Sequence, residues 1–165
     1  MFRLGQAWQP YPRLRAAARF PVRRLAAVTR AGVLLSVLAD DEVLVVDTES
    51  TLAEVAVPVK VGARFPLATA AGRALSAGMA PHVVPANYST SGWARALDDV
   101  RRRGLALERE EVQPGVACVA APVHAPTGHV VATISVVVDA TRQFSSVAEA
   151  VQQAAKVIGA GLSHR

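Results

Sequence analysis

The spacing of hydrophobic residues changes several times along the chain, and each change predicts a strand, a turn or a helix. Aliphatic and β-branched runs at 33–38 and 42–47 flank a short polar segment, a spacing typical of a β-hairpin. Valines alternate along 51–61, and Pro58 within that run favours a sheet edge or a bulge. Three further strands are expected, at 105–111, 116–123 and 129–138.

Helical periodicity is visible in four other segments. They are a helix that begins at Pro21 and ends before Gly32, an alanine-rich helix over 67–79 with Thr69 near its start, a helix capped by Ser91 that ends at Gly104, and a C-terminal helix from about Ser146. The strands mostly follow one another at short intervals, which favours antiparallel pairing over a doubly wound parallel sheet. We therefore predict an α+β fold with a mainly antiparallel central sheet and helices packed on it.

The composition is that of one folded domain. The chain has 165 residues, of which 52% are hydrophobic and 19% charged, a balance too apolar for a disordered polymer. No apolar run reaches the roughly 18 residues that cross a bilayer, so we expect a soluble, cytoplasmic protein without membrane contact. The single cysteine, Cys118, excludes an internal disulfide and a CxxC metal or redox pair.

The net charge of +5 is unevenly distributed along the chain. Residues 1–39 hold seven arginines and no acidic residue, whereas the rest of the chain has 11 basic and 13 acidic side chains. Nucleic-acid binding needs basic residues clustered on one face, so we do not expect it of the folded body. We interpret 1–20, with an irregular linker at 6–12, as a basic arm and 21–165 as the folded domain. The arm is solvated, contacts a partner or binds DNA weakly.

Four sequence strings together carry a resemblance to a known family. They are ATAAGRAL at 68–75, RGLA at 103–106, EEVQPGVACVAAPV at 110–123 and GHVVATISV at 128–136. In order and spacing they resemble the effector-binding domain of the IclR family of transcriptional regulators. The hairpin at 38–47 is also similar, so the resemblance extends from about residue 20 to the C-terminus. It implies a GAF-like fold, a small organic ligand that is often an acid, and assembly into dimers or tetramers.

The string FRLG at 2–5 resembles the end of the family's DNA-binding wing. This match implies that 1–20 is the remnant of the linker between wing and sensor, and that the chain lacks most of the helix-turn-helix domain. Three roles follow: a stand-alone sensor, a truncated regulator, or a subunit that co-assembles with a full-length relative. DNA binding through this chain alone is expected to be weak or absent.

Five residues form the candidate effector-binding set: Ala70, Ala71, Glu108, Cys118 and Ser135. The two alanines leave backbone amides unobstructed at a helix start, where unsatisfied N–H groups favour a carboxylate ligand. Ser135 offers a hydroxyl, Cys118 a weak thiol and Glu108 an acceptor, and the resemblance places all three on one cavity. The structural alternatives are a core-filling cysteine, a serine bonded to the sheet backbone and a glutamate at a solvated strand end.

Three positions near this cavity depart from the family pattern. Leu67 stands where the family usually has histidine, Val137 replaces a serine, and Val138-Asp139 replaces Gly-Pro. These differences have two interpretations: the chain binds a ligand that differs from those of other family members, or it has lost ligand binding at this site.

The alternative functions are a small cysteine-dependent enzyme on a GAF-like fold and a self-association module that senses nothing. A Cys118 nucleophile would need a base, but none of the histidines at 82, 124, 129 and 164 has a local signature that places it beside the thiol. The sequence also has no HxH or HExxH metal spacing. We therefore predict no enzyme activity, no metal and no cofactor.

Overall fold

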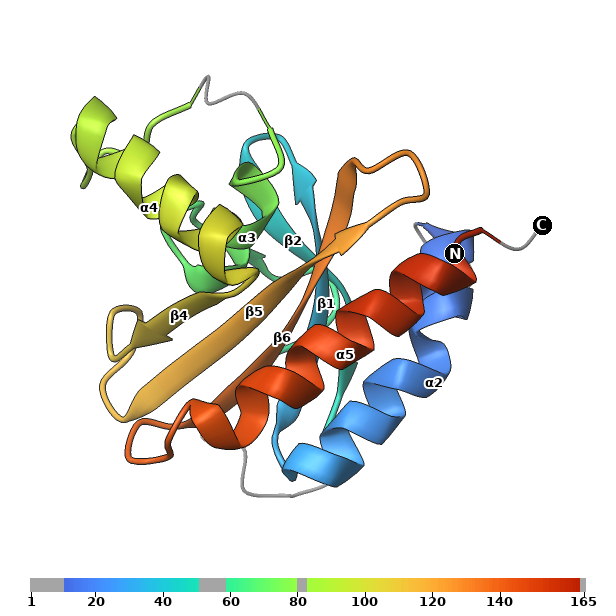
Figure 1. The fold of residues 1–165 in the computed structure, drawn as a ribbon. Helices are drawn as coiled ribbons and strands as arrows, with labels where there is room; N and C mark the ends of the chain where they lie inside the picture. The colour runs from blue at the N-terminus through green and yellow to red at the C-terminus, as the bar shows by residue number, and fades with distance from the viewer. Residues whose placement is uncertain (1–10, 51–58, 80–82, 164–165) are drawn as a thin grey trace, which may run out of the picture.

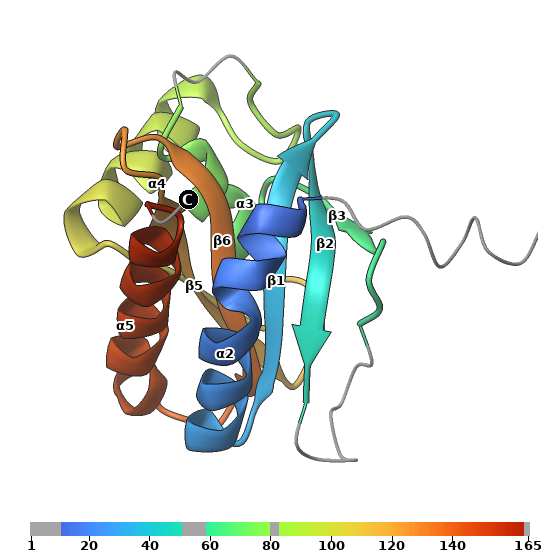
Figure 2. The same cartoon turned by 90° about the vertical axis from the view of Figure 1, so that its right-hand side faces the viewer.

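A computed structural model of the chain describes residues 11–50, 59–79 and 83–163. Its helices are α2 (Pro12–Thr29), α3 (Ala70–Ser76), α4 (Thr90–Arg103) and α5 (Ser145–Gly161), and its strands are β1 (Gly32–Ala39), β2 (Glu42–Glu49), β3 (Arg64–Phe65), β4 (Ala106–Arg109), β5 (Val116–His124) and β6 (Val130–Asp139). Within the described residues the strands form one six-stranded sheet in the order β3-β2-β1-β6-β5-β4, and every neighbouring pair is antiparallel. Helices α2 and α5 lie side by side on one face, and α3 and α4 lie on the other (Figure 1, Figure 2). The predicted fold class is confirmed.

The β1–β2 hairpin forms as the sequence predicts. Its two-residue turn consists of Asp40 and Asp41, whose φ angles of 52° and 60° are the positive values that such tight turns require. Aspartate tolerates this left-handed region better than most residues do. The strand predicted over 51–61 falls mainly on residues 51–58, which lie outside the described residues. After that segment, the short strand β3 pairs with β2.

The first helix differs from the prediction, because α2 begins at Pro12 and not at Pro21. Pro12 suits a first helical position, where its missing amide would have no helical partner. Pro21 lies inside the helix, where proline removes one backbone hydrogen bond. The buried face of α2 extends from Leu14 to Thr29, and its packing in the core maintains the helix across Pro21. The domain boundary expected at residue 20 therefore falls inside a helix.

The face of the sheet beneath α2 and α5 is apolar. Side chains alternate between the two faces of each strand, and those on this face include Val33, Leu35, Val37, Val119, Ile134 and Val136. Helix α5 approaches the sheet closely at Gly159, where an added Cβ would lie 2.5 Å from the carbonyl oxygen of His124. This layer is the main hydrophobic core of the domain.

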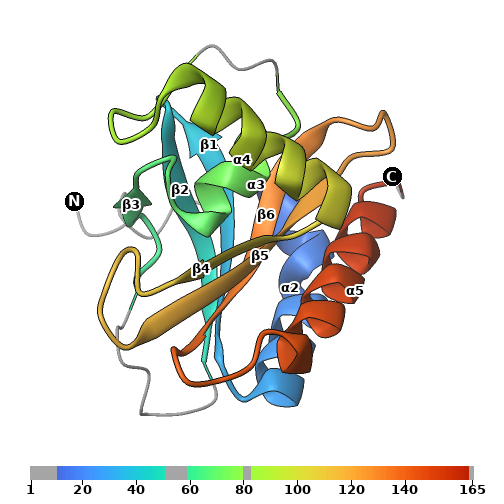
Figure 3. The same cartoon turned by 60° about the vertical axis from the view of Figure 1, so that its left-hand side comes forward.

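Helix α4 packs beside α3 on the opposite face of the sheet, as Figure 3 shows. Its inward side chains are buried at helical spacing: Trp93, Leu97 and Val100. The helix ends at Gly104 as predicted, with a φ of 69° that favours glycine. Its N-cap is Ser89, whose hydroxyl accepts from the Gly92 amide at 3.0 Å, so the prediction of Ser91 as the cap was two residues too late.

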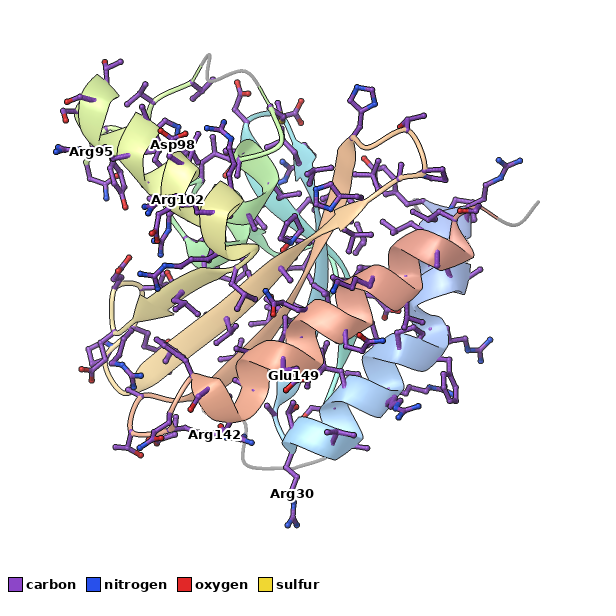
Figure 4. All side chains as sticks on the ribbon, in the orientation of Figure 1. Arg30, Arg95, Asp98, Arg102, Arg142 and Glu149 are labelled. Carbon is purple, nitrogen blue, oxygen red and sulfur yellow. The ribbon has the colours of Figure 1, made fainter. Side chains whose placement is uncertain are left out.

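The helices carry their charges on the outside. On α4 the arginine triplet pairs with aspartates one turn earlier, with Arg101 2.7 Å from Asp98 and Arg102 3.2 Å from Asp99. Figure 4 shows Arg95, Asp98 and Arg102 on the surface of this helix. Exposed pairs of this kind contribute only about 0–1 kcal/mol each to the free energy of unfolding, so their main effect is to make the outer surface of the helix polar. Among the described residues, no helix has the length and apolarity needed to cross a membrane.

Candidate functional site

A cavity of about 90 Å³ lies between the start of α3 and the sheet, on the face opposite α2 and α5. Its polar lining consists of Ser36, Thr69, Glu108, Gln113, Cys118 and Ser135, and its apolar lining includes Leu34, Val43, Phe65, Ala71, Val116 and Val137. The antiparallel register brings the polar groups together. Cys118 lies opposite Glu108 on β4 and opposite Val137 on β6, two residues from Ser135.

The first turn of α3 already has protein partners. The Thr69 hydroxyl accepts from the Gly72 amide at 3.1 Å and donates to the Pro66 carbonyl at 2.9 Å, which fixes the start of the helix. The Ala70 amide donates to Oε2 of Glu108 at 3.3 Å. The amide of Ala70, which the sequence analysis left free for a ligand carboxylate, therefore has a carboxylate from its own chain.

Glu108 is an acidic residue held in the interior. Its side chain comes from the short edge strand β4 and is only 8% exposed, not at a solvated strand end. Burial raises the pKa of Glu108, while the Ala70 amide and the Arg73 guanidinium oppose the rise and Glu111 adds to it. Arg73 donates to the carbonyl of Leu107 at 2.8 Å and lies 3.6 Å from Glu111. The carboxylate of Glu108 is thus partly compensated by a neighbouring positive charge.

Cys118 is a neutral thiol in this setting. Burial, and to a smaller extent the nearby charge of Glu108, raise its pKa from the ordinary 9.0 to about 12, although a hydrogen bond with the Ser135 hydroxyl and the charge of Arg73 act in the opposite direction. Only the thiolate is an effective nucleophile. At neutral pH the side chain therefore offers a small, polarisable, weakly polar surface and not a reactive sulfur.

Two buried hydroxyls face the cavity with no nitrogen or oxygen partner in the described part of the chain: that of Ser36, and that of Ser135, which has only the weakly polar thiol of Cys118 beside it. Their side chains are 1% and 0% exposed. Thr133, on the same strand face as Ser135, instead donates to the Ala121 carbonyl at 3.0 Å. Thr133 thus forms the hydrogen bond to the sheet backbone that was considered for Ser135, and Ser135 forms no such bond in the described part of the chain. A buried polar group left unpaired costs about 1–3 kcal/mol, and native proteins contain few of them.

Most of the predicted set meets at this cavity. Ala71, Glu108, Cys118 and Ser135 line it, whereas Ala70 is fully buried and contributes only its amide to Glu108. Their role as ligand contacts stays a prediction. The sequence analysis missed Ser36, although the alternation of β1 places it on the same face as the cavity.

The arrangement does not favour cysteine chemistry. His124 ends β5 six residues beyond Cys118, which is about 20 Å at the usual rise of a strand. His129 lies in the turn before β6, where its Nδ1 is 3.1 Å from the Thr127 hydroxyl. His82 and His164 fall outside the described residues. Among the side chains that the structure describes, no group of three or more His, Cys, Asp and Glu gathers as a metal site.

Comparison with known proteins identifies the family. Residues 12–160 match the model of the bacterial transcriptional regulator IclR C-terminal domain. The chain is 30% identical to the HTH-type transcriptional regulator BhcR of Paracoccus denitrificans over 183 residues, a match that covers 99% of the chain and 66% of BhcR. The chain thus spans just under two thirds of that relative's length.

Solved structures of regulators share the fold. The C-terminal domain of Escherichia coli KdgR superimposes with a TM-score of 0.78 at 23% identity, covering 92% of this chain and 99% of that one. An IclR homologue from Microbacterium hydrocarbonoxydans, complexed with 4-hydroxybenzoate, gives a TM-score of 0.85 at 24% identity, covering 98% and 74%. The IclR protein of Thermotoga maritima gives 0.84 at 20% identity, covering 99% and 74%. The family match over residues 12–160 and this shared fold lead to one conclusion: the chain belongs to the IclR family and carries the C-terminal domain of these bacterial transcriptional regulators.

Proposed function

We propose that this chain is the effector-sensing domain of an IclR-type regulator of transcription, and that it holds a small organic molecule in the cavity between α3 and the sheet. The observation that carries the proposal is the pair of buried hydroxyls of Ser36 and Ser135 on that cavity, neither of which has a nitrogen or oxygen partner among the described residues. A ligand that bonds to them removes the free-energy cost of leaving them unpaired. The 4-hydroxybenzoate complex of the Microbacterium homologue supports a small organic ligand in this family.

The size of the cavity limits the ligand. A volume of about 90 Å³ has room for several water-sized groups, since one water needs roughly 10–15 Å³ by the same measure. Pockets for drug-sized ligands usually have about 300–1,000 Å³. We therefore expect a ligand with few non-hydrogen atoms, held mainly by apolar walls and oriented by the polar groups.

The proposal also concerns assembly. We expect the domain to work through association with like domains, as a homodimer or tetramer or with a full-length regulator, and DNA contact through these residues to be weak. A ligand seated under α3 would fix this short helix against the sheet.

A thermal-shift experiment tests ligand binding. The chain is screened with small alcohols, amides and carboxylic acids, and a true ligand raises the free energy of unfolding by about 2.7 kcal/mol at a concentration 100 times its Kd. Ser36→Ala and Ser135→Ala should each weaken binding by about 2- to 10-fold, because each removes one hydrogen bond.

Thr133→Val is the matched control for these variants. It removes a buried hydroxyl on the same strand face, but that hydroxyl is bonded within the protein and does not line the cavity. It should lower the melting temperature of the free protein and leave the ligand-induced shift unchanged. A screen in which no compound stabilises the fold would contradict the proposed function.

A further inference from the structure

The outer surface of the α2–α5 layer carries an apolar groove. It has a volume of about 260 Å³ and is lined by Phe20, Arg24 and Val28 of α2 and by Ala154 and Val157 of α5, among others. The side chains of Phe20, Val28 and Val157 are 71%, 63% and 45% exposed. Soluble proteins rarely expose contiguous apolar patches without a use for them, and larger patches mark binding surfaces. The groove therefore calls for a partner.

The groove fits the apolar face of a helix. Phe20, Arg24 and Val28 follow one another at intervals of four residues, so they form one row along α2. The row is about 12 Å long at the rise of an α-helix, which corresponds to roughly two turns of a second helix. On the facing side, the short side chains of Ala150 and Ala154 allow a helix to approach α5 closely. Apolar side chains at helical spacing can thus lie between α2 and α5.

The surface around the groove is basic. Helix α2 has five arginines and no acidic residue, and α5 has one glutamate and one lysine, so the two helices have a net charge of +5. Arg30 follows α2 and projects beyond its end (Figure 4). Within the part of the chain that the structure describes, no arginine of α2 forms an ion pair. Asp47 and Glu49 line a separate groove on the other flank of α2, so they leave Arg24 uncompensated.

Shape and charge together limit the kind of partner. A second copy docked through the same face would bring two surfaces of net charge +5 together, which opposes association. The apolar side of α2 is already buried from Leu14 to Thr29, so this helix has no apolar face left to insert into a bilayer. Nucleic-acid phosphates would neutralise the arginines and leave the apolar rims uncovered. A helix with one apolar and one acidic face satisfies both features.

We propose that the groove between α2 and α5 docks an acidic amphipathic helix of a partner protein, with Phe20 as the apolar anchor and Arg24 as the charged contact. Aromatic residues and arginine are enriched among the residues that dominate binding energy at protein interfaces. The apolar face of the partner helix covers Phe20, Val28 and Val157, and its carboxylates face Arg24. This docking goes beyond ligand sensing, because the groove and the α3 cavity lie on opposite faces of the sheet (Figure 2).

Two synthetic peptides test the docking. Each has about 18 residues, long enough for a helix to form, with leucines at helical spacing on one face. One peptide has glutamates beside the leucines, and the other has lysines at the same positions. Fluorescence anisotropy measures their Kd values with the full chain. The glutamate peptide should bind at least about 10-fold more tightly than the lysine peptide, and added salt should reduce this preference.

Variants of the apolar rim locate the site. Phe20→Ala should weaken binding of the glutamate peptide by about 5- to 50-fold, and Val28→Ala by about 2- to 5-fold. Val61→Ala is the matched control, because it shortens an exposed valine that does not line the groove, and it should leave the Kd within about 2-fold of wild type. All three side chains are exposed, so the melting temperatures should stay close to that of the wild type.

A charge swap separates docking in the groove from general attraction. Arg24→Glu should weaken binding of the glutamate peptide by at least about 10-fold and should strengthen binding of the lysine peptide. Arg102→Glu makes the same charge change at an exposed position on α4, outside the groove. It should change neither Kd by more than about 2-fold, because exposed distant charges are screened.

Three results would overturn the inference. The first is equal affinity for the two peptides, and the second is an Arg102→Glu or Val61→Ala variant that weakens binding as much as its partner variant in the groove. The third is the absence of binding by either peptide at about 1 mM. In that case, sedimentation velocity and vesicles of phosphatidylglycerol, each compared between wild type and Phe20→Ala, would assign the groove to a second copy or to a membrane surface. None of these results bears on the ligand screen.

Discussion

The two faces of the sheet are composed differently, although the same strands supply both. Towards α2 and α5 the side chains are aliphatic or alanine, and they form the main core. Towards α3 the strands carry Ser36, Glu108 and Ser135 as buried polar groups. Ile134 and Ser135 are neighbours on β6, both fully buried, and they belong to opposite faces. Apolar burial stabilises a fold and an unpaired hydroxyl destabilises it. The face towards α2 and α5 therefore only stabilises the structure, whereas the face towards α3 and α4 combines a second apolar cluster with a polar cavity that lowers stability.

Replacing Ile134 should have the largest effect on stability. Ile134→Ala leaves a cavity in the core beneath α2 and α5 and should lower the free energy of unfolding by about 2–5 kcal/mol. Equilibrium urea denaturation measures the loss. Ligand affinity of the folded fraction should stay at the wild-type value, and a loss below about 1 kcal/mol would show that this face is less tightly packed than described.

Two glycines offer a matched test across the sheet. An added Cβ would overlap the backbone of Leu67 at Gly72, on α3, and would crowd the His124 carbonyl at Gly159, on α5. Gly72→Ala and Gly159→Ala should each lower the free energy of unfolding by about 1–3 kcal/mol, because the helix must move away from its neighbour. Only Gly72→Ala should also weaken ligand binding, since it displaces α3 from Glu108. Equal binding by the two variants would argue against a site beneath α3.

The buried thiol should make stability depend on alkaline pH. The pKa of Cys118 is raised to about 12, so folding favours the neutral thiol. This contribution is fully present below the ordinary pKa of about 9 and is lost as pH rises towards 12, at up to about 1.4 kcal/mol per pH unit. Denaturation midpoints measured between about pH 8 and pH 11 should fall more steeply in the wild type than in Cys118→Val. Parallel curves would mean that water reaches the thiol.

Ser135→Ala should have the smallest effect on stability. The hydroxyl has only the weak Cys118 thiol as a partner, so the free energy of unfolding should change by less than about 0.5 kcal/mol or rise slightly. Chemical denaturation of Ser135→Ala beside Ile134→Ala compares adjacent residues on the two faces directly. A loss above about 1 kcal/mol would indicate that Ser135 is hydrogen-bonded in the free protein.

Features set by short-range chemistry could be predicted from the sequence. The Asp40-Asp41 turn, the Thr69 cap of α3 and the Gly104 stop of α4 depend on residues close together in the chain, and the structure has all three. The start of α2 was mispredicted because Pro21 resembles a first helical position. Burial of the helix face on both sides of Pro21 outweighs the lost hydrogen bond.

The candidate site was only partly predictable, because its decisive contacts are distant in sequence. Cys118, Ser135 and Glu108 could be proposed from the family resemblance, and the register of β4, β5 and β6 places them together. The hydrogen bond from the Ala70 amide to Glu108 joins residues that are 38 positions apart, and no local sequence pattern predicts it. Ser36 lies in an apolar run, where only the alternation of β1 indicates a face.

The position of a bound ligand is the most direct test of a polar binding face opposite an apolar core. A crystal structure with the tightest-binding compound of the thermal-shift screen should show that molecule beneath α3, within hydrogen-bond distance of Ser36, Ser135 or Glu108. A ligand bound elsewhere, with those three side chains unchanged from the free protein, would contradict the account.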